Sequence, residues 1–273
     1  MMLTVKNVFK TYYGPKQKRE ALRGISFELP ETGLVFIAGE SGCGKSALIS
    51  LIGGTDRPTK GDIYLYDLHI NRCGDDVLTE YRNASTAFIS DLGEKMCGEV
   101  KRSISFSLGL QGKRYSTDDI VRAMQGAGLE RELLNGKAEK LSTEQRRLVF
   151  VARALIKNAR IVLADEPAEG LGEDEAEELY KLLKNLSKNR LIVVAARNVQ
   201  SAMRFGDRVI QLAGGKIKSD TYIAPPPPLP RCRRRVLSLT PRCLPRYSQL
   251  ARESLRLRRA RPLLSPPRPR RDE

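Results

Sequence analysis

Histidine is almost absent from the 273-residue chain, and its five cysteines form no C-x-x-C pair. The one histidine, His69, cannot build a histidine-based zinc cluster. An odd number of cysteines without regular spacing indicates free thiols in a reducing compartment. No apolar stretch approaches the ~20 residues that a membrane-spanning helix needs, and the N-terminus, which soon reaches Lys6 and Lys10, does not read as a signal peptide. We therefore expect a soluble, cytoplasmic chain.

Lysine is missing from the last part of the chain, which differs sharply in composition from the rest. Residues 223–273 contain 14 Arg, no Lys, 3 acidic residues and 11 of the 15 prolines, so most of the net charge of +16 lies there. Such a segment offers no periodic apolar face, and we expect a Pro/Arg-rich disordered tail. One interpretation is a polybasic arm that binds anionic lipid or nucleic-acid phosphates without reading sequence. The other is translation in a shifted frame after residue 222. Neither predicts a specific nucleic-acid partner.

A glycine-rich segment at 39–46, GESGCGKS, matches the phosphate-binding pattern G-x-x-x-x-G-K-[ST]. It follows an apolar run at 34–38 and precedes another at 47–52, as expected of a strand, a loop and a helix. Glycines let backbone N–H groups turn toward an anion, and the helix adds its positive N-terminal end. Lys45 can then reach the β- and γ-phosphates, and the Ser46 hydroxyl can hold Mg²⁺. The residues predicted to bind a nucleoside triphosphate here are Gly39, Ser41, Gly42, Cys43, Gly44, Lys45, Ser46 and Ala47.

Strands alternate with helices over residues 1–222, which predicts an α/β fold whose parallel sheet is covered on both faces. This part carries 34 basic and 29 acidic residues, an ordinary balance, and is long enough for a full core. The predicted strands are 2–9, 25–29, 34–38, 62–67, 86–90, 161–164 and 191–195, with a closing hairpin at 208–212 and 215–217. Helices are predicted after the glycine-rich loop, from a Ser116 cap to Gly126, up to Lys157 and over 174–186, and residues 92–140 are expected to be mostly helical.

Five ordered landmarks carry a family resemblance. They are an aromatic residue at Tyr12 or Tyr13, the loop at 39–46, Leu-Ser at 141–142 before a helix, Ala-Asp-Glu-Pro at 164–167 after an apolar strand, and Gly-Gly-Lys at 214–216. Residues 1 to about 222 resemble the ATP-binding subunit of an ABC transporter, and look most like the branch serving lipoprotein release and antimicrobial-peptide export. The resemblance implies a P-loop NTPase fold with a RecA-like parallel sheet core, an N-terminal antiparallel β subdomain and a helical insert at about 92–140.

The resemblance also implies a role for each landmark residue. Tyr12, with Tyr13 as second choice, would stack on adenine. Asp165 would hold the Mg²⁺ shell together with Ser46. Glu166 would position and polarise the attacking water as the general base.

Two further positions follow from the way this family assembles. Two cassettes pair head to tail, so the Ser142 hydroxyl would contact the γ-phosphate bound by a second cassette, of the same or another kind. Asp91 stands where the family has its Q-loop glutamine, and it is expected to reach Mg²⁺. The cassette pair would serve an integral membrane permease subunit, at the inner face of the cell membrane.

The sequence departs from the family pattern at several places. The signature Leu-Ser-Gly-Gly-Gln reads Leu-Ser-Thr-Glu-Gln at 141–145, so Thr143 and Glu144 replace both glycines. A carboxylate ~4 Å from a phosphate charge is repelled by roughly 1–4 kcal/mol. The switch histidine is missing: the chain has Ala-Ala-Arg197 after its last central strand. Ala47 replaces a hydroxyl residue, which removes a hydrogen bond worth ~1 kcal/mol. We expect nucleotide binding to survive these changes and hydrolysis to be slow.

Two functional hypotheses therefore stand. The first is a transporter ATPase of reduced activity, whose Lys45, Ser46, Asp165 and Glu166 form one competent half-site and whose Mg-ATP hydrolysis drives export or release of a substrate. The second is a nucleotide-binding regulatory cassette with little or no turnover. A P-loop kinase is a third possibility, but the chain has no evident acceptor site and a kinase would not explain Leu-Ser at 141–142.

Overall fold

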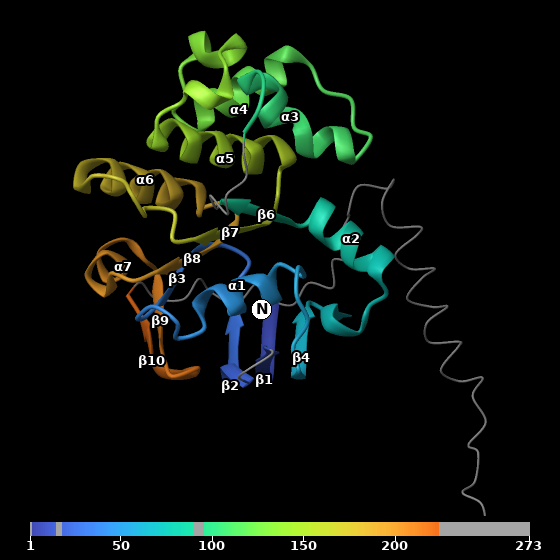
Figure 1. Cartoon of the computed structure of the whole chain (residues 1–273), viewed down its shortest axis with the longest axis vertical. Helices are drawn as coiled ribbons and strands as arrows, with labels where there is room; N and C mark the ends of the chain where they lie inside the picture. The colour runs from blue at the N-terminus through green and yellow to red at the C-terminus, as the bar shows by residue number, and fades with distance from the viewer. Residues whose placement is uncertain (1, 15–17, 90–95, 224–273) are drawn as a thin grey trace, which may run out of the picture. The chain divides into compact units, whose positions relative to one another are not determined.

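Two β-sheets with one helix between them form the framework of the protein (Figure 1). The computed structural model describes residues 2–14, 18–89 and 96–223, and every element named below lies in these ranges. The strands are β1 (Leu3–Tyr13), β2 (Lys18–Leu29), β3 (Gly33–Ala38), β4 (Lys60–Leu65), β5 (Leu68–His69), β6 (Thr86–Ile89), β7 (Ile161–Asp165), β8 (Leu191–Ala196), β9 (Arg208–Ala213) and β10 (Lys216–Tyr222). The helices are α1 (Lys45–Ile52), α2 (Asp75–Ala84), α3 (Val100–Leu110), α4 (Thr117–Gly126), α5 (Thr143–Lys157), α6 (Glu173–Leu186) and α7 (Val199–Phe205), with short 3₁₀ turns at Ile70–Arg72, Arg131–Asn135 and Ala138–Lys140.

The larger sheet of the described chain has six strands in the order β10-β9-β3-β8-β7-β6. Neighbouring strands are parallel except β10, which forms an antiparallel hairpin with β9. The central strands β3, β7 and β8 are built almost entirely from Leu, Ile, Val and Ala, and all their residues are buried except Gly33 and Asp165 at strand ends. Strands buried on both faces are typical of a parallel sheet covered by other layers. The predicted α/β fold is confirmed.

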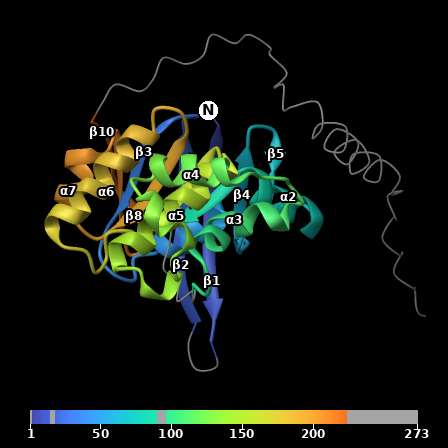
Figure 2. The ribbon, with the colours of Figure 1, turned by 90° about the horizontal axis from the view of Figure 1, so that it is seen from above.

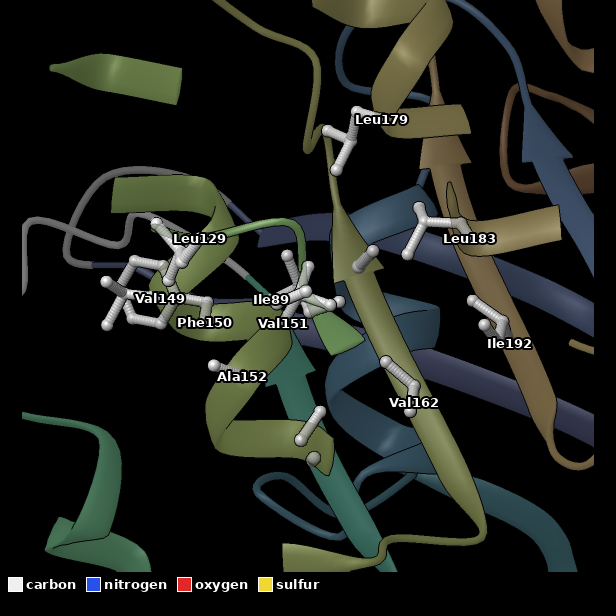
Figure 3. Packing of buried hydrophobic residues seen from close by; sticks show 14 of the residues in the cluster. Ile89, Leu129, Val149, Phe150, Val151, Ala152, Val162, Leu179, Leu183 and Ile192 are labelled. Carbon is white, nitrogen blue, oxygen red and sulfur yellow. The ribbon is translucent and has the colours of Figure 1, made fainter. Parts of the chain in front are cut away.

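Helices α3 to α7 cover one face of this sheet, and Figure 2 shows α4, α5 and α6 in front of it. Every second strand residue faces these helices and enters a single buried cluster. Figure 3 shows Val151 of α5 and Ile89 of β6 in this cluster, together with Leu183 of α6 and Ile192 of β8. Each fully buried side chain of this size contributes about 1.5–3 kcal/mol. The packing ties the helical insert to the sheet through α5.

The opposite face of the sheet packs on α1. Val35, Leu163 and Val193 point to this side and share a second buried cluster with Leu48 and Ile52 of α1. The smaller sheet, with the antiparallel strand order β2-β1-β4-β5, contributes to the same cluster, so α1 lies between the two sheets. The predicted N-terminal antiparallel β subdomain is confirmed. Because α1 is held from both sides, the loop that precedes it is held as well.

The strands of the N-terminal hairpin are longer than the sequence predicts. β1 continues from the predicted end at residue 9 to Tyr13, and β2 begins at Lys18, seven residues before the predicted strand at 25–29. The outermost of these extra residues are polar, and pairing between the two strands explains them: Tyr12 lies opposite Arg19 in the antiparallel register. Cross-strand hydrogen bonding therefore continues beyond the apolar alternation that marks the buried part.

The helical insert is partly described. Residues 96–140 contain α3, α4 and two of the 3₁₀ turns, and α4 begins at the predicted cap: Ser116 and Asp119 form a reciprocal capping box. The tail from residue 224 onward lies outside the described residues. In the described part, none of the helices combines the length and apolarity that crossing a bilayer requires.

Candidate functional site

A cleft of about 450 Å³ opens beside the carboxyl ends of β3, β7 and β8, facing the β1–β2 hairpin. Crevices at the carboxyl ends of parallel strands are the usual ligand sites of such sheets. The lining residues come from the loop before α1, the segments after β7 and β8, the hairpin and α5. They are Tyr12, Arg19, Ala21, Ser41, Gly42, Gly44, Lys45, Ser46, Ala47, Arg147, Asp165, Glu166, Glu169 and Arg197.

Two glycines give the loop its shape. Gly39 and Gly44 have φ angles of 155° and 109°, in the region that side chains rarely adopt. A Cβ atom would lie 2.4 Å from the Leu212 carbonyl oxygen at Gly39, and 2.4 Å from that of Ala21 at Gly44. Gly39 therefore acts by packing against β9, and it does not line the cleft. The Cys43 side chain is buried in the cluster around α1, so Cys43 contributes only its backbone to the predicted phosphate-binding surface of the loop.

Lys45 extends along the loop. Its side chain is 3% exposed, and Nζ donates to the carbonyl oxygens of Gly39 at 2.8 Å and Glu40 at 2.9 Å. Nζ also lies 3.5 Å from Oε1 of Glu166. A cation held in this way, with its head in a polar cleft, needs only a small movement to reach an anionic phosphate. This geometry fits the phosphate-binding role predicted for Lys45, which stays a prediction.

Asp165 and Ser46 meet at the floor of the cleft. The Ser46 hydroxyl donates to the Asp165 carboxylate, and Oδ1 of Asp165 is buried without a hydrogen-bond partner among the described atoms. Burial raises the pKa of Asp165, and the Glu166 charge raises it further, while the Ser46 hydrogen bond and Lys45 act in the opposite direction. A buried carboxylate oxygen without a partner fits a hard divalent cation.

No group of three or more His, Cys, Asp and Glu residues in the described ranges could hold a metal by itself. This agrees with Mg²⁺, which takes one or two protein ligands and completes its shell with phosphate oxygens and water. Asp165 and Ser46 are the described residues that would hold it. Asp91, the third residue predicted to bind the metal, lies outside the described residues.

Glu166 has an unusual backbone. Its φ angle is 46°, and its N–H donates to the carbonyl oxygen of Ala195 at 3.0 Å, which joins the ends of β7 and β8. A left-handed residue other than glycine costs roughly 1–3 kcal/mol, and such strain gathers at functional sites. The Glu166 side chain is 17% exposed, and its Oε2 atom lies 2.6 Å from Nε of Arg197. Glu166 thus lies between two cations, Lys45 and Arg197.

Tyr12 forms one wall of the cleft. Its hydroxyl donates to Oδ2 of Asp56 at 3.0 Å, and Nζ of Lys10 lies 4.8 Å from the ring centroid and 2.6 Å from Oδ1 of Asp56. Burial, with the Asp56 hydrogen bond, raises the pKa of Tyr12 to about 12. These contacts fix the ring at the cleft. Tyr13 is 76% exposed and does not line the cleft, so the geometry favours Tyr12 as the predicted adenine-stacking residue.

Comparison with known proteins decides the family. A family model described as ABC transporter matches residues 22–169, more than half of the chain. The chain belongs to the ABC transporter family. The ABC transporter ATP-binding protein MJ0796 of Methanocaldococcus jannaschii is 32% identical over 227 residues, which cover 80% of this chain and 96% of that protein. The macrolide export ATP-binding/permease protein MacB of Bdellovibrio bacteriovorus is 29% identical over 84% of this chain, and the match covers 35% of MacB.

A solved structure of MJ0796 matches this ABC cassette with a TM-score of 0.75 at 29% identity, over 82% of this chain and 100% of that one. It is a dimer in a post-hydrolysis state bound to ADP and Pi. ABC cassettes bind ATP, form dimers and pair with membrane subunits. The P-loop NTPase fold and the ATP-binding subunit inferred from the sequence are confirmed.

Ser142 lies away from the cassette's own cleft. It caps α5: its hydroxyl accepts from the Gln145 N–H at 3.1 Å, and its N–H donates to Oε1 of Gln145 at 3.0 Å. Thr143 and Glu144, the residues that replace the signature glycines, form the first turn of this helix. The contact of Ser142 with nucleotide bound by a second cassette stays a prediction.

Five cleft residues were not predicted as site residues: Arg19, Ala21, Arg147, Glu169 and Arg197. Arg19 comes from the part of β2 that precedes the predicted strand at 25–29, and it donates to the Gly42 carbonyl oxygen at 3.3 Å. Arg147 is buried on α5 and donates to the carbonyl oxygen of Glu169 at 3.3 Å. For Arg197, the sequence shows only that it follows the last central strand, near the position of the missing switch histidine. The spacing of the two acidic residues Glu166 and Glu169 was the one sequence signal for the partners of Arg197.

Proposed function

We propose that this cassette binds Mg-ATP and couples its hydrolysis, at reduced turnover, to export or release of a substrate through a separate integral membrane subunit. The observation that carries the proposal is the convergence of Lys45, Ser46, Asp165 and Glu166 on one cleft beside Tyr12. These groups come from a loop, a strand end and a hairpin, and their meeting supplies a phosphate-binding cation, a metal site, a general base and a stacking ring.

Each side chain has a task in this reaction. Lys45 leaves the carbonyl oxygens of Gly39 and Glu40 to bind the β- and γ-phosphates. Ser46 and Asp165 would hold Mg²⁺, which would supply positive charge to the phosphates when bound. Glu166 orients a water molecule in line with the γ-phosphate and accepts its proton. Tyr12 stacks on the adenine ring.

Direction and location belong to the same proposal. MacB is named for macrolide export, whereas the HrtA relative of Staphylococcus epidermidis, 30% identical over 80% of this chain, is named for hemin import. The resemblance to the lipoprotein-release branch favours export or release. We place the cassette in the cytoplasm, at the inner face of the membrane, where it pairs with a permease subunit and with a second cassette.

A second candidate function is a regulatory cassette with little turnover. The ion pair of Arg197 with Glu166 and the acidic residue Glu144 in the signature segment support it. Both candidates share ATP binding and differ only in the rate of hydrolysis. They are separated by a turnover assay, because a regulatory cassette hydrolyses little or no ATP even at saturating nucleotide and with its membrane partner.

Calorimetry of the full chain with Mg-ATP tests the shared part. Lys45→Ala should weaken ATP affinity by about 10- to 100-fold, the range expected for a lost hydrogen bond to a charged group. Lys181→Ala is the matched control, since Lys181 is exposed on α6, pairs with Glu177 and does not line the cleft. Wild-type protein without measurable ATP affinity, or a Lys45→Ala variant of unchanged affinity and melting temperature, would overturn the proposal.

A further inference from the structure

A chain of four charged groups crosses the catalytic end of the cleft. Lys45 Nζ lies 3.5 Å from Oε1 of Glu166, and Arg197 Nε lies 2.6 Å from its Oε2, so each carboxylate oxygen has its own cation. The Arg197 guanidinium continues to Glu169, with Nη2 3.0 Å from Oε1. Positive and negative charges therefore alternate along the chain of contacts from Lys45 through Glu166 and Arg197 to Glu169.

The backbone sets up this arrangement. The Glu169 N–H donates to the Glu166 carbonyl oxygen at 3.0 Å, a turn that brings both carboxylates to one side. Asp165 at the end of β7 pairs in register with Ala195 near the end of β8, so Arg197 comes directly beside that turn. A basic residue at position 197 can thus bridge the two acids without any rearrangement of the sheet.

We propose that Arg197 is a positioning residue that clamps Glu166 in this ion pair and thereby limits ATP turnover. The inference rests on the proposed function, because it concerns the general base of that reaction. Glu169 is the anchor of the clamp: it holds the far side of the guanidinium. The low turnover of this cassette is then caused inside its own cleft, in addition to any effect of the signature segment.

The physical reason is competition for the carboxylate. A general base must turn an oxygen lone pair to the attacking water and accept its proton, and a carboxylate bound to two cations does this poorly. When ATP binds, Lys45 transfers to the phosphates and frees Oε1. Arg197 stays, since Glu169 retains it and the nearby carboxylates raise the pKa of its guanidinium above the usual range. Its departure from Glu166 becomes part of the barrier to hydrolysis.

Arg197 also lines the cleft, so one competing role is contact with the phosphates. The two roles predict opposite kinetics. A clamp leaves ATP binding nearly unchanged and lowers kcat. A phosphate ligand improves both binding and kcat, as an additional cation at the γ-phosphate would.

Steady-state hydrolysis and calorimetric ATP affinity of the full chain distinguish these roles. Arg197→Gln should raise kcat about 3- to 10-fold with less than a threefold change in KM and in affinity. Arg197→Lys, which keeps the cation, should retain the low kcat. Glu169→Gln should give a smaller rise, because it only loosens the anchor. Arg204→Gln is the matched control: it removes an exposed arginine on α7 that pairs with Glu177, outside the cleft.

Combining Arg197→Gln with two other changes makes the test decisive. In a Glu166→Gln background the increase in kcat should vanish, since the clamped base is gone. In Thr143→Gly/Glu144→Gly, where the signature glycines are restored, Arg197→Gln should again raise kcat. Unchanged kcat in both the wild-type and the restored background overturns the clamp, and a loss of affinity together with kcat assigns Arg197 to the phosphates. Absence of ATP binding by the wild-type chain would instead overturn the proposed function.

Discussion

Asp165 places function and stability in conflict at a single side chain. Its carboxylate lies in a half-buried position with Oδ1 lacking a partner among the described atoms, and burial raises its pKa. An unsatisfied buried acceptor costs about 1–3 kcal/mol. The same carboxylate is one of the two described groups that would hold Mg²⁺, together with Ser46. The residue is therefore suited to a ligand-bound state and unfavourable without it.

Asp165→Asn should separate these two effects. Removing the charge should leave the ligand-free protein unchanged or more stable, by up to about 1 kcal/mol or 2–4 °C in melting temperature. The same variant should lose most of the stabilisation that Mg-ATP gives the wild type, measured by thermal unfolding with and without ligand. Asp174→Asn, an exposed change in the first turn of α6, is the control for loss of one surface acid. An Asn variant that Mg-ATP stabilises as strongly as the wild type would contradict the assignment.

The pH dependence of this variant pair has a defined sign. A carboxyl group whose folded pKa is raised destabilises the folded state once it ionises, so its unfavourable contribution grows as the pH rises above the ordinary carboxyl range of about 4. The stability difference between Asp165→Asn and wild type should therefore be larger at neutral pH than at the acidic end of the transition. Mg-ATP should reduce the difference by neutralising the charge.

At the scale of one element, the residues at the N-terminus of α5 favour helix formation but are poorly suited to binding a phosphate. Ser142 and Gln145 form a capping box, and Glu144 lies in the first turn, where a negative charge favours the helix dipole. The family pattern has glycines where Thr143 and Glu144 stand. Glycines there cost helix stability but leave the backbone N–H groups open to a phosphate. This cassette has the more stable helix.

Restoring the glycines should reverse that balance. Thr143→Gly/Glu144→Gly should lower stability by about 1–2 kcal/mol. It should raise ATP turnover at least about fivefold, because the repulsion by Glu144 amounts to about 1–4 kcal/mol. The matched control is Thr117→Gly/Asp118→Gly, which changes the same two positions after the equally capped Ser116 of α4. The control should lose similar stability in denaturant titration without gaining turnover. Equal turnover of the two variants would remove Glu144 as a cause of slow hydrolysis.

Sequence patterns predicted the elements whose signal is local. The apolar strands β3, β7 and β8 and the capped helix α4 were found because their own residues specify burial or an end. Helix α2 was not predicted, because it buries only Leu78 and Tyr81 and depends on distant partners. The Tyr81 hydroxyl donates to the carbonyl oxygen of Ile52 at 2.7 Å. Such tertiary contacts have no local pattern, and the seven-residue helix α7 is too short to show one.

The same distinction holds at the cleft. The glycine-rich loop and the Asp165–Glu166 pair could be predicted from the sequence, because each directly follows an apolar strand. The Arg197–Glu166–Glu169 network does not, because it needs the register of β7 beside β8 and the left-handed backbone of Glu166. Arg19 reaches the loop only through the hairpin register opposite Tyr12. Pairing between segments far apart in sequence was the missing information.

On the scale of the whole molecule, the cleft and the signature segment belong to different layers. The loop at 39–46 is held by α1 between the two sheets, whereas Ser142 begins α5 on the other face of the larger sheet (Figure 1). Ser142 does not line the cleft of its own chain. If two cassettes pair head to tail, as the family resemblance implies, a second chain would complete the site. We then expect ATP to act as a ligand of the dimer more than of the monomer.

Glu166→Gln should make this dependence visible. The amide cannot accept the proton of the attacking water and lacks the charge that pairs with Arg197, so bound ATP persists and the dimer should accumulate. Light scattering with Mg-ATP should give twice the monomer mass for Glu166→Gln, and monomer with ADP. Lys45→Ala/Glu166→Gln should stay monomeric, because binding of the phosphates comes before pairing.

If Glu166→Gln stays monomeric but the same change with Thr143→Gly/Glu144→Gly dimerises, the signature segment limits assembly and a second cassette with intact glycines is the expected partner. If neither dimerises while both bind ATP, the two-chain site is wrong for this protein.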